Sequence, residues 1–314
     1  MFSSSSDLRR FASSLFIPPY CDRQRLKVAS LTSSACSTSP TLLPAATMAS
    51  AFRNFLMICS AECRRSFLLM KNPSPKLALD FHNIWIRIWG AFQKPLLQHT
   101  WEAVCQSQSV DQVVIATNSE KVRTVAASFG AMVVLTGEHK CGTDRIAEVA
   151  SGICSEDDLI LNVQGDEVGI RPSEIETLIA AINSSPEADM GTLAIPIRAE
   201  EQILDPSCVK VVFSELTRRA IYFSRSPIPY WRTNASQCAR PQAFLHIGVY
   251  GFRHAFLRRL TQSPATHLEK AEMLEQLRAL ELGAHICVGI VDEHVKGIDT
   301  LEDYERHQAI RRAT

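Results

Sequence analysis

The feature that most constrains this chain is a short apolar segment that ends at two acids. Residues 159–163 form a largely apolar run without alternation, which is typical of a strand buried on both faces of a parallel sheet. Gln164, Gly165, Asp166 and Glu167 follow at once, and the glycine permits a tight turn. A carboxylate at the carboxyl end of such a strand suits Mg²⁺, which takes oxygen ligands and bridges substrate phosphates. A solvated loop with incidental acids is the alternative.

Strand and helix patterns alternate around this segment. Strands are expected at residues 113–116 and 132–135, and helices at 97–107, 120–129, 142 onwards with Thr143 as its cap, and 173–182. Such alternation with short links predicts an α/β fold with a mixed, mostly parallel sheet and helices on both faces. Right-handed crossovers would place the loops 116–119, 140–145 and 164–167 at one edge of the sheet.

In the second half of the chain, the expected order of strands and helices is different. Strands are expected at residues 193–197, 209–213, 220–223, 244–251 and 285–291, and one helix at 268–282 that ends at Gly283. Strands that follow one another without long helices predict an extension of the sheet, which we interpret as the part that carries a second substrate. Composition alone favours a solvated face as the interpretation of the polar side of the 268–282 helix.

The charge balance, hydropathy and cysteine content limit which classes of partner the chain is expected to bind. Lys and Arg total 33 and Asp and Glu total 33, so the chain has no global attraction to nucleic acid or to an anionic membrane. The apolar region 51–70 is interrupted by charges and is not expected to span a bilayer. The 10 cysteines contain no CxxC pair, which indicates reduced thiols and a cytoplasmic protein. We therefore expect no nucleic-acid partner and no membrane partner.

The first 93 residues differ from the rest. Residues 1–48 are rich in Ser, Thr, Ala and Pro, which suits a transit peptide, and hence an organellar location, or a disordered tail. Residues 49–93 are an atypical region in which residues 67–70 are the expected strand, and they form either a degenerate or a mis-translated start of the domain. Residues 94–314 form the expected main domain. The sequence contains neither a P-loop nor a GxGxxG motif.

Seven motifs, in order, resemble the 3-deoxy-D-manno-octulosonate (Kdo) cytidylyltransferase family, also called CMP-Kdo synthetases, over residues 94 to about 308. They are KPLLQH at 94–99, CGTDR at 141–145, NVQGDE at 162–167, YFSR at 222–225, HIGVY at 246–250, EMLEQLR at 272–278 and GIDT at 297–300. The resemblance implies a Rossmann-like nucleotide-diphospho-sugar transferase fold and a homodimer. It also implies that CTP and Kdo react to give CMP-Kdo and pyrophosphate, towards lipopolysaccharide.

The resemblance also implies roles for particular residues. Asp166 and Asp299 would be the catalytic metal ligands and hold Mg²⁺, although Asp299 taken alone reads as an acid before a helix. The residues that would bind the nucleotide are Lys94, Thr117, Cys141, Gly142, Thr143, Arg145 and Gln164. The residues that would bind Kdo are Arg225, His246, Tyr250, Glu275 and Gln276, with Arg225 and His246 as hydrogen-bond donors. A core histidine remains the alternative for His246.

The amino end departs from the family pattern. The loop of arginines and lysine that clasps the CTP triphosphate in the family has no counterpart that we can identify, and Lys76 is its only echo. Smaller departures are Cys141 where the family has Ser or Asn, Asn118 where it has Asp, and Val168-Gly169, which should loosen the loop after Asp166. Two alternatives to an active Kdo enzyme therefore stay open. One is a catalytically impaired homologue that only binds or dimerises, and the other is a cytidylyltransferase for a related sugar acid.

Overall fold

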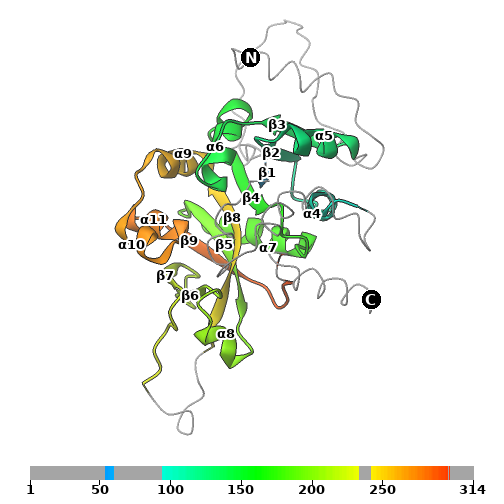
Figure 1. The fold of residues 1–314 in the computed structure, drawn as a ribbon. Coiled ribbons are helices and arrows are strands. Elements are labelled where there is room, and N and C mark those ends of the chain that lie inside the picture. The colour runs from blue at the N-terminus through cyan, green and yellow to red at the C-terminus, as the bar shows by residue number, and fades with distance from the viewer. Residues whose placement is uncertain (1–53, 60–93, 233–241, 296, 298–314) are drawn as a thin grey trace, which may run out of the picture.

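The protein is built on one mixed β-sheet with helices on both faces (Figure 1). The structure, a computed structural model, describes residues 54–59, 94–232, 242–295 and 297. The nine strands are β1 Asn54–Cys59, β2 Gln112–Thr117, β3 Met132–Leu135, β4 Leu159–Gln164, β5 Met190–Pro196, β6 Lys210–Phe213, β7 Ala220–Ser224, β8 Phe244–Arg253 and β9 Ile286–Ile290. The helices are α4 Leu96–Cys105, α5 Glu120–Ser128, α6 Gly142–Ile153, α7 Pro172–Asn183, α8 Glu200–Leu204, α9 His254–Gln262, α10 His267–Glu272 and α11 Glu275–Glu281.

The strand order confirms the expected fold class. The main path is β3-β2-β1-β4-β8-β5-β9, and β6 joins it through β8 and pairs with β7. Strands β1 to β4 are mutually parallel, whereas β8 runs antiparallel to both β4 and β5. Because parallel strands share one carboxyl edge, the loops that follow β2, β3 and β4 emerge on the same side of the sheet, as predicted.

Strand β1 occupies a position for which the sequence prediction was wrong. We expected residues 67–70 to supply the first strand, but β1 lies between β2 and β4 and pairs with both. The side chains of Leu56, Met57 and Ile58 have no exposed surface. A strand buried on both faces requires an uninterrupted apolar run, and residues 55–59 form one. Charged residues on either side made this run look like part of a longer, interrupted segment. Residues 67–70 lie outside the described residues.

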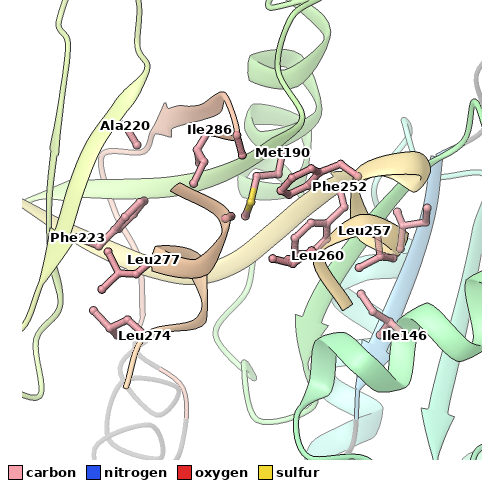
Figure 2. Close-up of a cluster of buried hydrophobic side chains, with 14 of the residues drawn as sticks. Ile146, Met190, Ala220, Phe223, Phe252, Leu257, Leu260, Leu274, Leu277 and Ile286 are labelled. Atoms are coloured by element: carbon pink, nitrogen blue, oxygen red, sulfur yellow. The ribbon is translucent and has the colours of Figure 1, made fainter. Parts of the chain in front are cut away.

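Two hydrophobic cores lie on opposite faces of the sheet. Alternate residues of β4 divide between them: Leu159, Leu161 and Val163 pack with α4, α5 and α7, and Ile160 packs with α6, α9 and α11. The second core contains Ile146 of α6, Leu257 and Leu260 of α9, and Leu274 and Leu277, which gather around Phe223 and Phe252 of the sheet (Figure 2). The residues at the carboxyl edge of β4 are therefore held on a strand that is packed on both sides.

Helix α7 approaches the sheet closely because two neighbouring strands carry glycine beneath it. Gly191 of β5 and Gly251 of β8 are cross-strand partners. A Cβ atom on Gly191 would lie 2.5 Å from Cγ1 of Ile182, and one on Gly251 would lie 2.4 Å from its Cδ1. Those distances are shorter than a carbon–carbon contact, so the side chain of Ile182 fills the space that the two glycines leave.

The structure corrects three further details of the prediction. The expected 268–282 helix is divided into α10 and α11 at Met273, whose φ of 54° is left-handed. Helix α9 was not expected. The N-cap of α6 is Cys141 rather than Thr143, whose hydroxyl bonds a distant residue instead. By contrast Ser119 caps α5, with its Oγ 3.4 Å from the Val122 nitrogen, and Gly130 and Gly283 have positive φ at helix ends, as expected.

In the part of the chain that the structure describes, no helix has the length and apolar character to cross a membrane.

Candidate active site

The loop that follows β4 is an ordered turn at the carboxyl edge of the sheet. The Glu167 nitrogen donates to the Gln164 carbonyl at 3.1 Å, and the Val168 nitrogen donates to the Asp166 carbonyl at 2.8 Å. From α4, the Thr100 hydroxyl donates to the Gly165 carbonyl at 3.0 Å. The side chain of Asp166 is half-buried. The backbone around this carboxylate is therefore fixed by bonds from within the loop and from a neighbouring helix.

A segment far along the chain docks against this turn. We call residues 293–295 and Gly297 the C-terminal strap. Its His294 Nδ1 lies 2.8 Å from Oε1 of Glu174, which is only 1% exposed, and a Cβ on Gly297 would lie 2.8 Å from the Asp166 carbonyl oxygen. Asp299 itself lies outside the described residues. Among the described residues, the strap contacts both α7 and the Asp166 turn.

Gly169, in the loop after β4, lies directly against the C-terminal strap. A Cβ at this position would lie 2.4 Å from the Val295 carbonyl oxygen, so the strap backbone approaches the loop closely here. The residues on either side, Val168 and Ile170, are 5% and 3% exposed. The absence of a side chain at Gly169 permits this packing, and a loop looser than one with proline stays a prediction.

The acids at this edge have the chemistry that Mg²⁺ requires. The ion prefers carboxylate oxygens and retains waters and substrate phosphates as further ligands. Asp166 offers a carboxylate at the ligand-binding edge of the sheet, and Gly297, the first residue of the second acidic motif, lies against the Asp166 turn. The residues present therefore fit the predicted ion, with the assignment to Asp166 and Asp299 remaining a prediction.

One carboxylate joins the predicted nucleotide loop to the predicted sugar-acid residues. Glu275, at the start of α11, accepts from Thr143 Oγ1 at 2.8 Å, from Cys141 Sγ at 3.1 Å and from Arg278 Nη2 at 2.9 Å. Burial, followed by the charge of Glu275, raises the pKa of the Cys141 thiol. Because both oxygens of Glu275 are bonded to protein, its observed contacts hold α6 and α11 together.

Other residues predicted to bind the nucleotide lie around the same edge. Thr117, fully buried at the end of β2, accepts from the Ser119 nitrogen at 3.1 Å. Arg145 is 2% exposed, and its Nη1 donates to Thr136 Oγ1 at 2.5 Å, so it braces the segment after β3. Lys94 Nζ lies 2.8 Å from Glu102 Oε1 and remains half-exposed. Gly142 opens α6 and Gln164 ends β4.

His246 is a neutral ring with a defined tautomer. Its Nε2 lies 3.0 Å from Thr192 Oγ1, and this hydroxyl also lies 2.9 Å from the Val249 carbonyl and 3.1 Å from that of Ile247. A hydroxyl has one proton, which goes to a carbonyl, so Thr192 accepts from Nε2–H of His246. Burial lowers the pKa of His246 to about 3. The remaining nitrogen, Nδ1, is then an acceptor, so the ring can accept from a sugar hydroxyl, whereas we expected it to donate to the carboxylate and hydroxyls of the sugar acid.

Tyr250 and Gln276 form a polar pair between β8 and α11. The Tyr250 hydroxyl donates to Gln276 Oε1 at 3.1 Å, and burial with the nearby charge of Glu275 raises the pKa of Tyr250. Gln276 is 4% exposed, and no hydrogen-bond partner for its Nε2 exists among the described residues. A buried amide donor without a partner is costly unless a ligand or water takes it.

Arg225 is held by backbone groups from two directions. Its Nε donates to the Glu272 carbonyl at 2.8 Å and its Nη1 to the Pro206 carbonyl at 3.0 Å. Its own carbonyl accepts from Lys210 Nζ at 2.5 Å, and that lysine is fully buried. Sequence reasoning missed Lys210, Thr192 and Glu272 as parts of this site. A lone charged residue inside the expected strand 209–213 was the available signal for Lys210.

Comparison with known proteins agrees with this geometry. The family model described as "Cytidylyltransferase" matches residues 91–286. The chain is 41% identical over 221 residues to a protein of Geobacter sulfurreducens named 3-deoxy-manno-octulosonate cytidylyltransferase, an alignment that covers 68% of this chain and 87% of that protein. A Rhodopirellula baltica protein of the same name is 41% identical over 222 residues, which covers 69% and 88% of the two chains.

Solved structures extend the comparison to the fold. A CMP:2-keto-3-deoxy-manno-octonic acid synthetase complexed with CTP matches with a TM-score of 0.70 and 32% identity, and covers 84% of this chain and 99% of its own. A 4-diphosphocytidyl-2C-methyl-D-erythritol synthase, at 14% identity and a TM-score of 0.52, shares the fold alone. The chain therefore belongs to the cytidylyltransferase family and, within it, to the 3-deoxy-manno-octulosonate cytidylyltransferases.

Proposed function

We propose that this protein transfers CMP from CTP to Kdo, giving CMP-Kdo and pyrophosphate for the synthesis of lipopolysaccharide. The observation that supports the proposal is the contact between Gly297 and the Asp166 turn, because Gly297 begins the second acidic motif and lies at the ligand-binding edge of the sheet. The names of the relatives support the choice of CTP and Kdo as substrates.

The reaction requires positioning and charge neutralisation more than covalent help. The anomeric hydroxyl oxygen of Kdo attacks the α-phosphorus of CTP, the bond from that phosphorus to the pyrophosphate oxygen breaks, and the hydroxyl proton passes to solvent. Bound Mg²⁺ would neutralise phosphate charge and lower the pKa of the attacking hydroxyl. We assign its protein ligands to Asp166 and Asp299.

The chain's own residues divide the remaining work. The loop at the start of α6, with Cys141, Gly142 and Thr143, faces the nucleotide, together with Lys94, Thr117 and Gln164. Arg145, in the first turn of α6, links this loop to the segment after β3 through its bond to Thr136.

On the sugar-acid side, Arg225 supplies the positive charge for the carboxylate, and neutral His246 accepts from a hydroxyl. Gln276 Nε2 is a buried donor for the same substrate. Tyr250 positions Gln276 through its hydroxyl, and Glu275 holds the start of α11 through its bond to Thr143. We also propose a homodimer, as the resemblance implies.

Pyrophosphate release by the purified full-length chain with CTP, Kdo and Mg²⁺ tests the proposal, with CMP-Kdo identified by mass spectrometry. We expect Asp166→Asn and Asp299→Asn each to lower kcat by about 1,000-fold or more, since each removes a ligand charge worth several kcal/mol in the transition state. Asp157→Asn is the matched control, because Asp157 is exposed just before β4. Activity that survives both substitutions would refute the metal assignment.

Two other outcomes identify the alternatives. A chain that binds CTP but releases no pyrophosphate with any sugar acid is the impaired homologue. Its cause would lie at residues 60–93, where the family has its triphosphate loop and which lie outside the described residues. Release with N-acetylneuraminate in place of Kdo would identify a cytidylyltransferase for a related sugar acid.

A further inference from the structure

We propose that Cys141, Asp144 and Glu275 form a second metal site, which takes a thiophilic divalent cation such as Zn²⁺ or Cd²⁺. Each residue offers one ligand atom, and the three atoms lie within 4.8 Å of one another. The site is separate from the Mg²⁺ position assigned to Asp166 and Asp299, with which it shares no ligand.

The three ligands come from two elements that the fold holds together. Cys141 is the N-cap of α6 and Asp144 lies in its first turn, whereas Glu275 begins α11. The distance from Cys141 Sγ to Glu275 Oε1 is 3.1 Å. In a tetrahedral zinc site the ligand atoms lie about 3.5 Å apart, a separation of the same order as those within this group. All three side chains are half-buried, so an ion from solvent can reach them.

The surroundings of the cluster also suit a cation of charge two. Arg278 Nη2, 2.9 Å from Glu275 Oε1, supplies one positive charge. Arg278 is itself paired with Glu269 at 3.2 Å, so once the thiol ionises these groups together carry a net charge of about minus three, which a divalent ion largely offsets. Thr143 donates to the other oxygen of Glu275 at 2.8 Å and fixes the carboxylate, as partners of ligating carboxylates do.

The thiol decides which ions bind. Sulfur ligands select Zn²⁺ and Cd²⁺, whereas Mg²⁺ prefers oxygen alone. Binding breaks the S–H bond, the proton passes to solvent, and a metal–sulfur bond forms without any change of oxidation state. Three protein ligands leave a fourth position open for water or a substrate oxygen. Because the site lies in the loop assigned to the nucleotide, a bound ion would inhibit in competition with CTP, a consequence that rests on the proposed function.

Titration of the reduced full-length protein with Cd²⁺, followed by the ultraviolet charge-transfer band of the cadmium–thiolate bond, tests the site directly. The comparison is between the unmodified protein, Cys141→Ser and Cys208→Ser. Cys208 is the matched control because its Sγ lies 3.7 Å from a single carboxylate, that of Asp205. We expect Cys141→Ser to lose about one equivalent of the tightest thiolate band, and Cys208→Ser to keep it.

Asp144→Asn provides a second measurement that does not alter the thiol. It should weaken Cd²⁺ binding by about tenfold or more while the band itself remains, because a charged ligand becomes neutral. Identical titrations of the unmodified protein and Cys141→Ser, with both folded by circular dichroism, would overturn the proposal. If Cys141→Ser fails to fold, an unchanged affinity in Asp144→Asn would overturn it instead. A cadmium band in a protein that releases no pyrophosphate would leave the site standing and refute only the function.

Discussion

At the scale of the residue, His246 shows how partners decide what a side chain can do. The sequence placed it on a strand as either a core histidine or a hydrogen-bond donor to the sugar acid. In the structure its ring lies between Phe223 and Tyr250, with centroid distances of 5.1 Å and 5.4 Å, and Thr192 occupies its Nε2–H. The ring is therefore packed between aromatic side chains, as the core alternative predicts, and its one N–H is already bonded within the protein.

The pH dependence of stability should report this histidine. Burial holds the pKa of folded His246 at about 3, below its ordinary 6.5. Between these two pH values the unfolded chain binds a proton at His246 and the folded chain does not. The resulting stability is complete above pH 6.5 and is lost as the pH falls towards the folded pKa. Because the ring is only half-buried by area, we expect a loss of about 1–3 kcal/mol between about pH 7 and pH 4.

Urea denaturation of the unmodified protein and of His246→Gln over this pH range measures the effect. The variant should show a shallower loss of unfolding free energy, because it lacks the titrating group. Parallel curves for the two proteins would show that His246 titrates normally in the folded state.

At the scale of the element, close packing depends on residues that have no side chain. Helix α7 can lie against β5 and β8 only because Gly191 and Gly251 leave room for Ile182. The sequence pattern did not predict a packing role for either glycine, because strands are recognised from the residues that carry side chains. The same limit applies to the break between α10 and α11, where the helical apolar spacing continues through Met273 although the backbone turns there.

Gly251→Ala should destabilise the protein by about 1–3 kcal/mol, because the added methyl group overpacks the contact with α7. Its Cβ would lie 2.4 Å from Ile182 Cδ1 and 2.9 Å from Leu161 Cδ2. Gly248→Ala, on the same strand, is the control, since no heavy atom lies within 4 Å of its Cβ position. It should change stability by less than about 0.5 kcal/mol. Equal unfolding free energies for the two variants in a denaturant titration would contradict the packing argument.

At the scale of the whole molecule, the site depends on segments from the middle and the end of the chain. The C-terminal strap meets the residues after β4 through Arg171 and Glu293, 2.8 Å apart, through His294 and Glu174, and through Gly169 and Val295. These contacts hold Gly297 against the Asp166 turn. The position of Gly297 therefore depends on the complete fold and not on its neighbours in the sequence.

Gly169→Ala tests this dependence. The new methyl group would lie 2.4 Å from the Val295 carbonyl oxygen, which belongs to the backbone and can move only if the strap moves. We expect a fall of about tenfold or more in kcat and a higher Mg²⁺ concentration for half-maximal rate, because the second acid is displaced. Gly137→Ala is the control, with its nearest heavy atom at 3.8 Å. A normal Mg²⁺ requirement in Gly169→Ala would show that the position of the strap does not affect metal binding.

The sequence by itself determined the pieces and their chemistry. Apolar runs located most strands, cap residues such as Ser119 located helix ends, and the seven motifs identified the family. These features depend on neighbours a few residues apart, so they can be read along the chain. Only the tertiary structure decided that residues 54–59 fill the centre of the sheet, that Thr143 bonds Glu275 rather than capping its helix, and that Gly297 lies against Asp166. Each of those contacts joins residues at least 50 positions apart, and packing rather than local preference selects such partners.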